Sequence, residues 1–382
     1  SMKRMLVNSS IVLLSVVFTL AAVEIALRIF SLPDAPRCGW KHTSGVPETE
    51  LNQLGFRGRE YRYDDSDYVI LLLGDSQVEA VGCGFHEMPE RYLESAMDSL
   101  LPQSVRVFSL GAPGYGQDQE YLALLHYTDS YRADMVVLWE TPANDIWNNL
   151  FPTHWPGTSD GWSKPTFWLE DGELRGPSSQ LGDEVRASEL RIADLLMRGL
   201  GDWSFDRSWE ERLPPAYTPL VGYSGEPLPD WQRRWDEDEG LMRQENLATG
   251  KSHLSIYLTP RSPRMDYAVE LADRLLQAIE NHLDSCGTEL VVFATDNVPD
   301  SSAQVEHAVY RLEGELYAVS EGQYRRNVED MNVSVRFIPV PITMEDWRIS
   351  PRDSHLNPNA NRQVMQALAD SLADLIRGAP EL

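Results

Sequence analysis

The feature that most constrains the fold is a regular alternation of short apolar runs with longer amphipathic segments. Short apolar runs are typical of buried strands in a parallel sheet, and amphipathic segments are typical of helices that cover it. We expect strands at 68–73, 105–110, 135–139, 289–294 and 333–340. We expect helices at 90–101, 118–131, 267–283 and 358–376. The alternation predicts an α/β domain built on a flavodoxin-like, doubly wound parallel sheet of about five strands.

The alternation is interrupted after the third expected strand. Residues from about 147 to 260 are rich in Pro, Gly and Trp, with helix candidates at 184–197 and 230–247. We expect an insertion that leaves the third strand and lines the site at the sheet edge. Its tryptophans either contact sugar rings or acyl chains of a substrate, or form a core of the insertion itself. They are Trp147, Trp155, Trp162, Trp168, Trp203, Trp209, Trp231 and Trp235.

An apolar segment precedes the domain. Residues 5–23 carry no charge and follow Lys3 and Arg4. As a helix they would span roughly 28 Å, enough to cross a bilayer core. Positive charge ahead of the segment predicts a cytoplasmic N-terminus and an exported domain. The segment is either an uncleaved anchor or a cleaved signal peptide, and the lack of a small-x-small cleavage site favours the anchor.

These features predict three parts. Residues 1–31 are expected to form the signal anchor or transmembrane helix. Residues 32–67, rich in Pro, Gly and charge, are expected to form a linker and lead-in segment. Residues 68–382 are expected to form the main domain, with the insertion inside it.

Composition excludes some partners and leaves others without support. Lys and Arg number 33 against 59 Asp and Glu, a net charge of −26, which opposes nucleic-acid binding. Cys38, Cys83 and Cys286 lie far apart with no C-x-x-C spacing, so no metal site is indicated and their disulfide state is open. No cofactor is indicated either.

The polar groups with catalytic potential follow the expected strands. Ser76 comes directly after the first strand, where a nucleophile would lie at the carboxyl edge of the sheet. His355 could take its proton as a general base, and Asp353 could orient the imidazole. The alternative is that Asp353 or Asn357 only caps the terminal helix.

Two further strand ends add possible oxyanion donors. Gly114 lies in a glycine-rich stretch after the second strand, where a backbone N–H can approach a substrate closely. Asn144 follows the third strand, and its amide could donate to an oxyanion. Each of these residues alone is equally typical of an ordinary loop.

In this combination and order, the residues resemble the SGNH (GDSL-type) serine hydrolases of the membrane-anchored or exported type. Gly74-Asp-Ser76 matches the first block of that family, Gly114 the second, Asn144-Asp145 the third, and Asp353 with His355 the last. The resemblance covers roughly residues 50–146 and 265–378, including Asn52-Gln-Leu-Gly-Phe-Arg-Gly58 ahead of the domain.

The resemblance implies a role for each matched residue. Ser76 would attack an ester carbonyl, His355 would act as base and then as acid, and Asp353 would orient His355. The oxyanion would be held by the N–H groups of Ser76 and Gly114 and by the side chain of Asn144. There are two departures from the family pattern: Pro142 stands where a glycine is common, and a single residue separates Asp353 from His355.

The resemblance implies an extracytoplasmic serine esterase, periplasmic or extracellular. It would remove acetyl or other short acyl groups from a glycan or a small molecule. One alternative is an O-acyltransferase that passes the acyl group to a cell-envelope or exopolysaccharide glycan. A second is a catalytically idle glycan-binding or assembly protein with the same fold. The expected partners are an ester substrate, glycan-linked or not, and the membrane; the natural substrate and the oligomeric state are left open.

Overall fold

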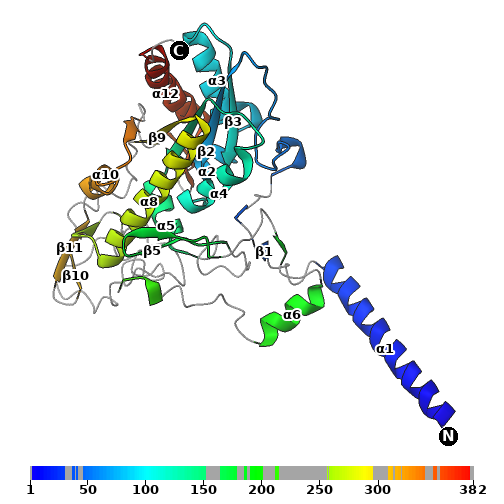
Figure 1. Ribbon diagram of the computed structural model, residues 1–382. Coiled ribbons are helices and arrows are strands. Elements are labelled where there is room, and N and C mark those ends of the chain that lie inside the picture. Colours follow the sequence, from blue (N-terminus) through cyan, green and yellow to red (C-terminus); the bar gives the residue numbers. More distant parts are fainter. Residues whose placement is uncertain are drawn as a thin grey trace.

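The centre of the molecule is a five-stranded parallel sheet with the order β12-β9-β4-β2-β3 (Figure 1). The strands are β2 (Tyr68–Gly74), β3 (Val105–Gly111), β4 (Met135–Glu140), β9 (Glu289–Thr295) and β12 (Val335–Ile338). Numbered along the chain, this order is 2-1-3-4-5, the flavodoxin-like doubly wound arrangement. The predicted fold class is therefore confirmed.

The computed structural model describes most of the chain, in fifteen ranges. They are residues 2–30, 37–38, 40–41, 46–151, 164–178, 185–186, 190–200, 211–214, 256, 258–295, 309–312, 315–319, 321–339, 347–350 and 353–378.

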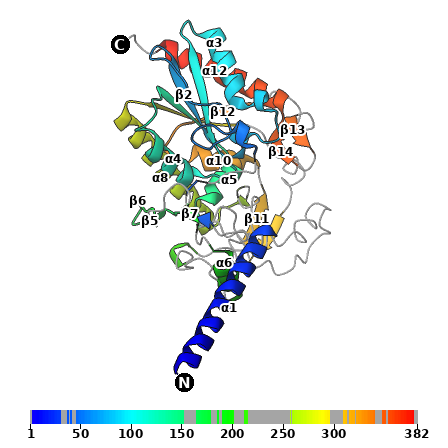
Figure 2. The same cartoon turned by 90° about the vertical axis from the view of Figure 1, so that its right-hand side faces the viewer.

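Helices cover both faces of the sheet (Figures 1 and 2). On one face, α3 (Pro89–Leu100) and α12 (Pro358–Gly378) pack against each other and against the strands. On the other lie α4 (Gln117–Tyr127), α8 (Pro263–Cys286) and α10 (Glu321–Glu329). Successive strand residues point to opposite faces, so Leu71 and Leu73 join one core while Ile70 and Leu72 join the other.

The register brings the carboxyl ends of the strands to one edge. Gly74 at the end of β2 is aligned with Gly111 of β3 and Trp139 of β4. From this edge β2, β3 and β4 lead into α2 (Ser76–Glu79), the loop before α4, and α5 (Pro142–Asn148). Loops from neighbouring parallel strands therefore meet here, where doubly wound folds place their sites.

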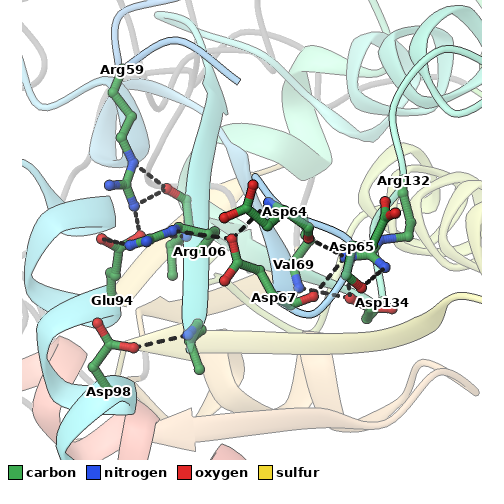
Figure 3. Close-up of polar contacts among 12 residues, drawn as sticks. Arg59, Asp64, Asp65, Asp67, Val69, Glu94, Asp98, Arg106, Arg132 and Asp134 are labelled. Carbon is green, nitrogen blue, oxygen red and sulfur yellow. Dashed lines mark hydrogen bonds and ion pairs between the residues drawn. The ribbon is translucent and has the colours of Figure 1, made fainter. Parts of the chain in front are cut away.

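The opposite edge, at the amino ends of the strands, is held by charged side chains (Figure 3). The Asp134 carboxylate accepts from the backbone N–H of Val69 at 2.7 Å, and Asp98 accepts from that of Val105 at 2.8 Å. Arg132 donates to the backbone carbonyls of Asp65 and Asp67 at 3.0 and 2.6 Å. These contacts satisfy backbone groups that the sheet leaves open at its rim.

The segment before β2 packs on the domain. It contains η1 (Glu48–Glu50), and Phe56 lies in the hydrophobic core at 2% exposure. The Arg57 guanidinium donates to the carbonyls of Glu79 at 3.0 Å and Cys83 at 2.8 Å, in the loop that follows α2. Residues 46–67, which were expected as linker and lead-in, thus support the edge that carries Ser76.

Several small elements lie outside the central sheet. The two-residue strands β1 (Arg37–Cys38) and β7 (Val185–Arg186) pair, and β5 (Trp168–Glu170) pairs with β6 (Glu173–Arg175). A three-stranded sheet contains β8 (Leu258–Thr259), β10 (Val309–Leu312) and β11 (Glu315–Val319). The remaining short elements are η2 (Phe85–Glu87), β13 (Arg348–Ser350) and β14 (Asp353–Leu356).

The insertion differs from expectation at one described point. The predicted helix over 184–197 is wrong in its first part, because Val185 and Arg186 form a strand with a segment far away in the sequence. The helix there is α6 (Arg191–Leu200). The predicted helix at 230–247 lies outside the described residues.

The N-terminal apolar segment forms one long helix, α1 (Met2–Ile29), which extends away from the sheet (Figures 1 and 2). Within it, Val7–Ile29 is 23 residues long with a mean hydropathy of 2.4, and none of its most apolar stretch is buried in the domain. It is long and apolar enough to cross a membrane, a property that anchors and signal sequences share.

Candidate active site

Ser76 is the first residue of α2, directly after β2. The preceding Asp75 caps this helix, its carboxylate accepting from the Gln77 N–H at 2.8 Å. Glycines at two strand ends allow α2 to lie directly on the sheet edge. A Cβ at Gly74 or Gly111 would approach the side chain of Val78 in α2 to 2.7 or 2.6 Å. Short strand-to-helix turns of this kind expose a serine hydroxyl at the top of a sheet.

His355 and Asp353 lie on β14, which pairs with β13 just before α12. Asn357 is the cap of α12, since its side chain accepts from the Ala360 N–H at 2.9 Å. Of the two residues that sequence analysis allowed as caps, Asn357 has that position. Asp353 instead accepts from the backbone N–H of His355 at 3.1 Å.

The structure brings these residues together with Ser76, which lies 279 positions before His355 in the sequence. His355 Nε2 is 2.8 Å from Ser76 Oγ, and His355 Nδ1 is 2.5 Å from Asp353 Oδ1. The histidine and aspartate side chains are 40% and 39% exposed, so a substrate can reach them from solvent. A hydroxyl, an imidazole and a carboxylate thus form one hydrogen-bonded line, the arrangement that activates a serine.

The charge of Asp353 suits this line. Partial burial opposes its ionised form, but hydrogen bonds from the ring and the backbone N–H of His355 outweigh burial, so the pKa of Asp353 lies below its usual value. The carboxylate is therefore ionised at neutral pH. An acceptor at this position keeps the proton on Nδ1 of His355 and leaves Nε2 to accept from Ser76.

Asn144 lies in α5, and Gly114 lies on the loop before α4. Asn144 Nδ2 donates to Asp75 Oδ2 at 2.7 Å, and because a carboxylate only accepts, the nitrogen end of the amide must face Asp75 beside Ser76. Gly114 has a φ of +66°, a conformation that favours glycine. Its carbonyl accepts from Asn148 Nδ2 at 2.7 Å, so α5 holds the Gly114 loop. Pro142 begins α5, where proline is well tolerated.

A buried ion pair that sequence analysis did not single out supports these two segments. Lys164 Nζ lies 2.5 Å from Asp118 Oδ2 and 2.7 Å from the carbonyl of Asn148. Burial raises the pKa of Asp118 and lowers that of Lys164, and their contact opposes both shifts. The lysine joins the start of α4 to the end of α5, the helix that carries Asn144. The sequence signal that could have identified Lys164 is the scarcity of lysine. The chain has four lysines: Lys3, Lys41, Lys164 and Lys251.

A second buried group consists of three acids. Glu120, Glu140 and Asp145 are at most 1% exposed. Burial, reinforced by mutual repulsion and by Asp75, raises the pKa of Glu140 to about 8 and those of Glu120 and Asp145 well above their usual range. Within the described residues, neither carboxyl oxygen of Glu120 has a hydrogen-bond partner. With a pKa of about 8, Glu140 at the end of β4 holds a proton at neutral pH, while Glu120 lies in α4 and Asp145 in α5 next to Asn144.

The described residues contain no group of three or more His, Cys, Asp or Glu side chains able to hold a metal ion. Cys83 is buried, Cys286 is exposed, and both are free thiols. The side chain of Cys38 lies outside the described residues.

Two of the eight tryptophans of the insertion are among the described residues. Trp147 is 1% exposed and packs in the main hydrophobic core, so this ring has a structural role. Trp168 is partly buried in β5, with the Arg212 guanidinium 4.3 Å from its ring centre. The other six tryptophans of the insertion, and with them the expected wall of the site, lie outside the described residues.

Comparisons with known proteins give distant structural likenesses only. No family model matches the chain, and no curated protein sequence matches it. Among solved structures it is similar to the lipase Lip_vut3 from a goat rumen metagenome at 10% identity, covering 80% of this chain and 97% of that one with a TM-score of 0.39. It is also similar to the psychrotrophic esterase EstA from Pseudoalteromonas sp., at 11% identity, 82% and 100% coverage and a TM-score of 0.34.

A third similar structure is a family 3 carbohydrate esterase of Clostridium thermocellum, at 11% identity, 81% and 98% coverage and a TM-score of 0.33. At TM-scores this low, the likenesses add no weight to a functional assignment. That assignment depends on the hydrogen-bonded residues of this chain itself.

Proposed function

We propose that the protein is a serine esterase that hydrolyses carboxylic esters at the carboxyl edge of its sheet. The observation that carries the proposal is the hydrogen-bonded line from Ser76 Oγ through His355 to Asp353. The line is formed by segments from opposite ends of the domain, and it lies at the edge where doubly wound folds bind their substrates. A structural role alone does not require a serine, a histidine and an ionised aspartate in series at a solvent-accessible rim.

The chemistry follows from this geometry. Ser76 Oγ attacks the ester carbonyl carbon while its proton passes to His355 Nε2. The carbonyl oxygen becomes an oxyanion, and the N–H groups of Ser76 and Gly114 and the Asn144 amide stabilise it. When the C–O bond breaks, the leaving alkoxide takes the proton from His355 and departs as the alcohol. The acyl group stays on Ser76 until a water, deprotonated by His355 Nε2, attacks its carbonyl carbon. The bond to Ser76 Oγ then breaks, Ser76 takes the proton back from His355, and the acid is released.

We further propose that α1 anchors the enzyme in a membrane with the catalytic domain outside the cytoplasm. The apolar length of Val7–Ile29 and the positive Lys3 and Arg4 ahead of it support this topology. The favoured substrates are short acyl esters, such as acetyl esters, on an extracytoplasmic glycan or a small molecule. The solvent exposure of His355 and Asp353 suits ester hydrolysis.

The test uses the full chain in detergent micelles with p-nitrophenyl acetate and a fluorophosphonate probe. We expect turnover, and covalent labelling that Ser76→Ala abolishes, because the probe requires an activated hydroxyl. Ser99→Ala, which removes a serine on α3 away from the site, is the matched control and should keep both activities. A chain that neither turns over the ester nor reacts with the probe would contradict the proposal and favour the idle binding protein.

The same assay separates hydrolysis from acyl transfer. Water and an added sugar acceptor compete for the acyl-Ser76 intermediate. An esterase releases free acetate at the same rate with or without the acceptor. Release of p-nitrophenol that depends on the sugar, with the acetyl group recovered on it, would identify an O-acyltransferase instead.

A further inference from the structure

The helix α6, which belongs to the insertion, has an exposed apolar side. Leu195 and Leu196 are 47% and 56% exposed. At 100° per residue, Ile192 and Leu196 fall on one side of α6, about 40° apart, and Leu195 lies between Ile192 and Arg191 at the border of that side. Helices with an apolar side and a charged side are typical of membrane interfaces.

This helix is attached to α1 by a specific contact. Glu24, near the C-terminal end of α1, accepts from the backbone N–H of Arg191 at 3.1 Å and from that of Ile192 at 3.0 Å. Its two carboxyl oxygens thereby cap the first turn of α6, where unpaired N–H groups and the helix dipole favour a negative charge. Arg28 also donates to Glu24, at 2.6 Å, and holds the carboxylate in place.

The contact is confined to one point of α1. Among the described side chains of α1, those of Glu24 and Leu27 are partly covered and the others are exposed. Figures 1 and 2 both show α6 beside the C-terminal end of α1, at a distance from the central sheet, and Figure 1 shows it running across the direction of α1. The rest of α1 is therefore left for other surroundings.

The position of Glu24 sets the level of α6 relative to a bilayer. Glu24 is the first charged residue after Arg4, and the segment between them carries no charge. If α1 spans the membrane as proposed above, the outer boundary of the hydrocarbon core lies near Glu24. Glu24, which lies near this boundary, also accepts the hydrogen bonds from the first turn of α6.

We propose that α6 is a membrane-interface helix whose apolar side, with Leu195 and Leu196, inserts into the outer leaflet of the bilayer that holds α1. The partner is a phospholipid surface. Glu24 fixes the start of the helix, with Arg191, at the level of the lipid headgroups. Two contacts, one transmembrane and one interfacial, then fix the orientation of the catalytic domain above the membrane. The inference rests on the proposed anchor, since it needs α1 in the bilayer.

The test measures depth in the membrane by fluorescence quenching. The full chain, with Cys38→Ser and Cys286→Ser so that only the buried Cys83 remains, is labelled with NBD at single introduced cysteines. The positions are Leu195→Cys and Leu196→Cys, with Leu14→Cys in α1 as the deep reference. Leu125→Cys on α4, another exposed leucine, is the matched control in water. The protein is reconstituted in phosphatidylcholine–phosphatidylglycerol vesicles containing lipids with a nitroxide at a shallow or a deep position.

We expect labels at 195 and 196 to emit at shorter wavelength than the label at 125 and to be quenched more by the shallow nitroxide than by the deep one. The label at 14 should be quenched more by the deep nitroxide. If 195 and 196 behave like 125 while 14 is quenched, the interfacial helix is wrong and the anchor stands. If 14 is also unquenched and carbonate extracts the protein, the anchor is wrong and the inference fails with it.

A variant of Glu24 tests the role of the cap in the same vesicles. Glu24→Ala removes both acceptors of the α6 N–H groups, so quenching at 195 by the shallow nitroxide should fall while quenching at 14 is unchanged. Glu24→Gln keeps one oxygen acceptor and should lie between the alanine variant and the parent. Equal quenching at 195 in all three proteins would show that Glu24 does not position the helix.

Discussion

The two edges of the central sheet differ in how their acidic side chains are paired and in the direction of their pKa shifts. At the amino ends of the strands, acids and arginines are paired with each other or with backbone groups (Figure 3). Arg106 Nε lies 3.4 Å from Asp67 Oδ2, and a hydrogen bond from the Asp64 N–H lowers the pKa of Asp67. At the carboxyl ends, Glu120 and Glu140 are buried, and burial raises their pKa values.

The difference separates an edge with a structural role from the edge that carries the proposed active site. Compensated charges at the amino edge satisfy open backbone groups of β2 and β3, and the carboxylates there act as hydrogen-bond acceptors. At the carboxyl edge, the buried Glu120, Glu140 and Asp145 have raised pKa values, and an ionised Asp353 lies at the rim. The ionised state of Asp353 is part of the proposed chemistry. Substitutions at the two edges should therefore separate activity from stability.

The largest expected effect is at the rim. Asp353→Asn should lower kcat by about 10⁴-fold, because the amide no longer holds the imidazole of His355 in the tautomer that accepts from Ser76. The measurement is kcat for p-nitrophenyl acetate. Asp374→Asn removes an exposed carboxylate of α12 and is the matched control. A loss of less than about tenfold, well short of the triad expectation, would assign the orienting role to another acid.

The next effect concerns the oxyanion. Asn144→Ala should lower kcat by about 10²–10³-fold with little change in KM, since the amide would act on the charge that develops in the transition state. Asn359→Ala, an exposed position in the first turn of α12, should change neither constant. A rise in KM with an unchanged kcat would instead place Asn144 in substrate binding.

Local patterns in the sequence predicted the central sheet and several of the candidate site residues. Apolar runs predicted all five central strands to within a few residues, because a buried strand can be recognised from its own short run of apolar residues. Ser76, Gly114 and Asn144 follow consecutive strands along the chain, and parallel strands end at one edge, so their proximity could be expected. Asp353 and His355 required the family pattern, because nothing local links them to Ser76.

Other features depend on contacts that no local pattern records. Glu120 looks like an ordinary charged helix position, and only the packing of α4 buries it. Lys164 meets its partner, Asp118 of α4, only in the folded protein, because the two lie 46 positions apart in the sequence. The strand at 185–186 exists because residues 37–38 pair with it, so a helical pattern there was misleading.

A smaller effect tests the buried acids through the pH dependence of stability. The pKa of Glu140 is about 8 in the folded protein against an ordinary value of 4.5. Between these values the unfolded chain loses a proton that the folded protein keeps, so the free energy of unfolding falls as pH rises. For this one group the slope is about 1.4 kcal/mol per pH unit.

Glu140→Gln removes the titration, so the loss of stability between pH 5.5 and 7.5 should become smaller. Urea unfolding of parent and variant at both pH values measures it. Glu173→Gln, at an exposed position of β6, should leave the slope unchanged. Identical slopes in parent and Glu140→Gln would mean that this carboxyl is ionised in the folded protein.

The smallest expected effect is at the opposite edge. Arg132 holds the turn before β2 through the carbonyls of Asp65 and Asp67, but its side chain is 39% exposed, so solvent weakens these contacts. Arg132→Ala should lower the free energy of unfolding by about 1 kcal/mol and leave kcat unchanged. Arg132→Lys, which keeps the charge but not the two-pronged donor, should recover part of the loss. A fall in kcat with unchanged stability would mean that the amino edge also positions the catalytic residues, because contacts there would then be transmitted along β2 to Ser76.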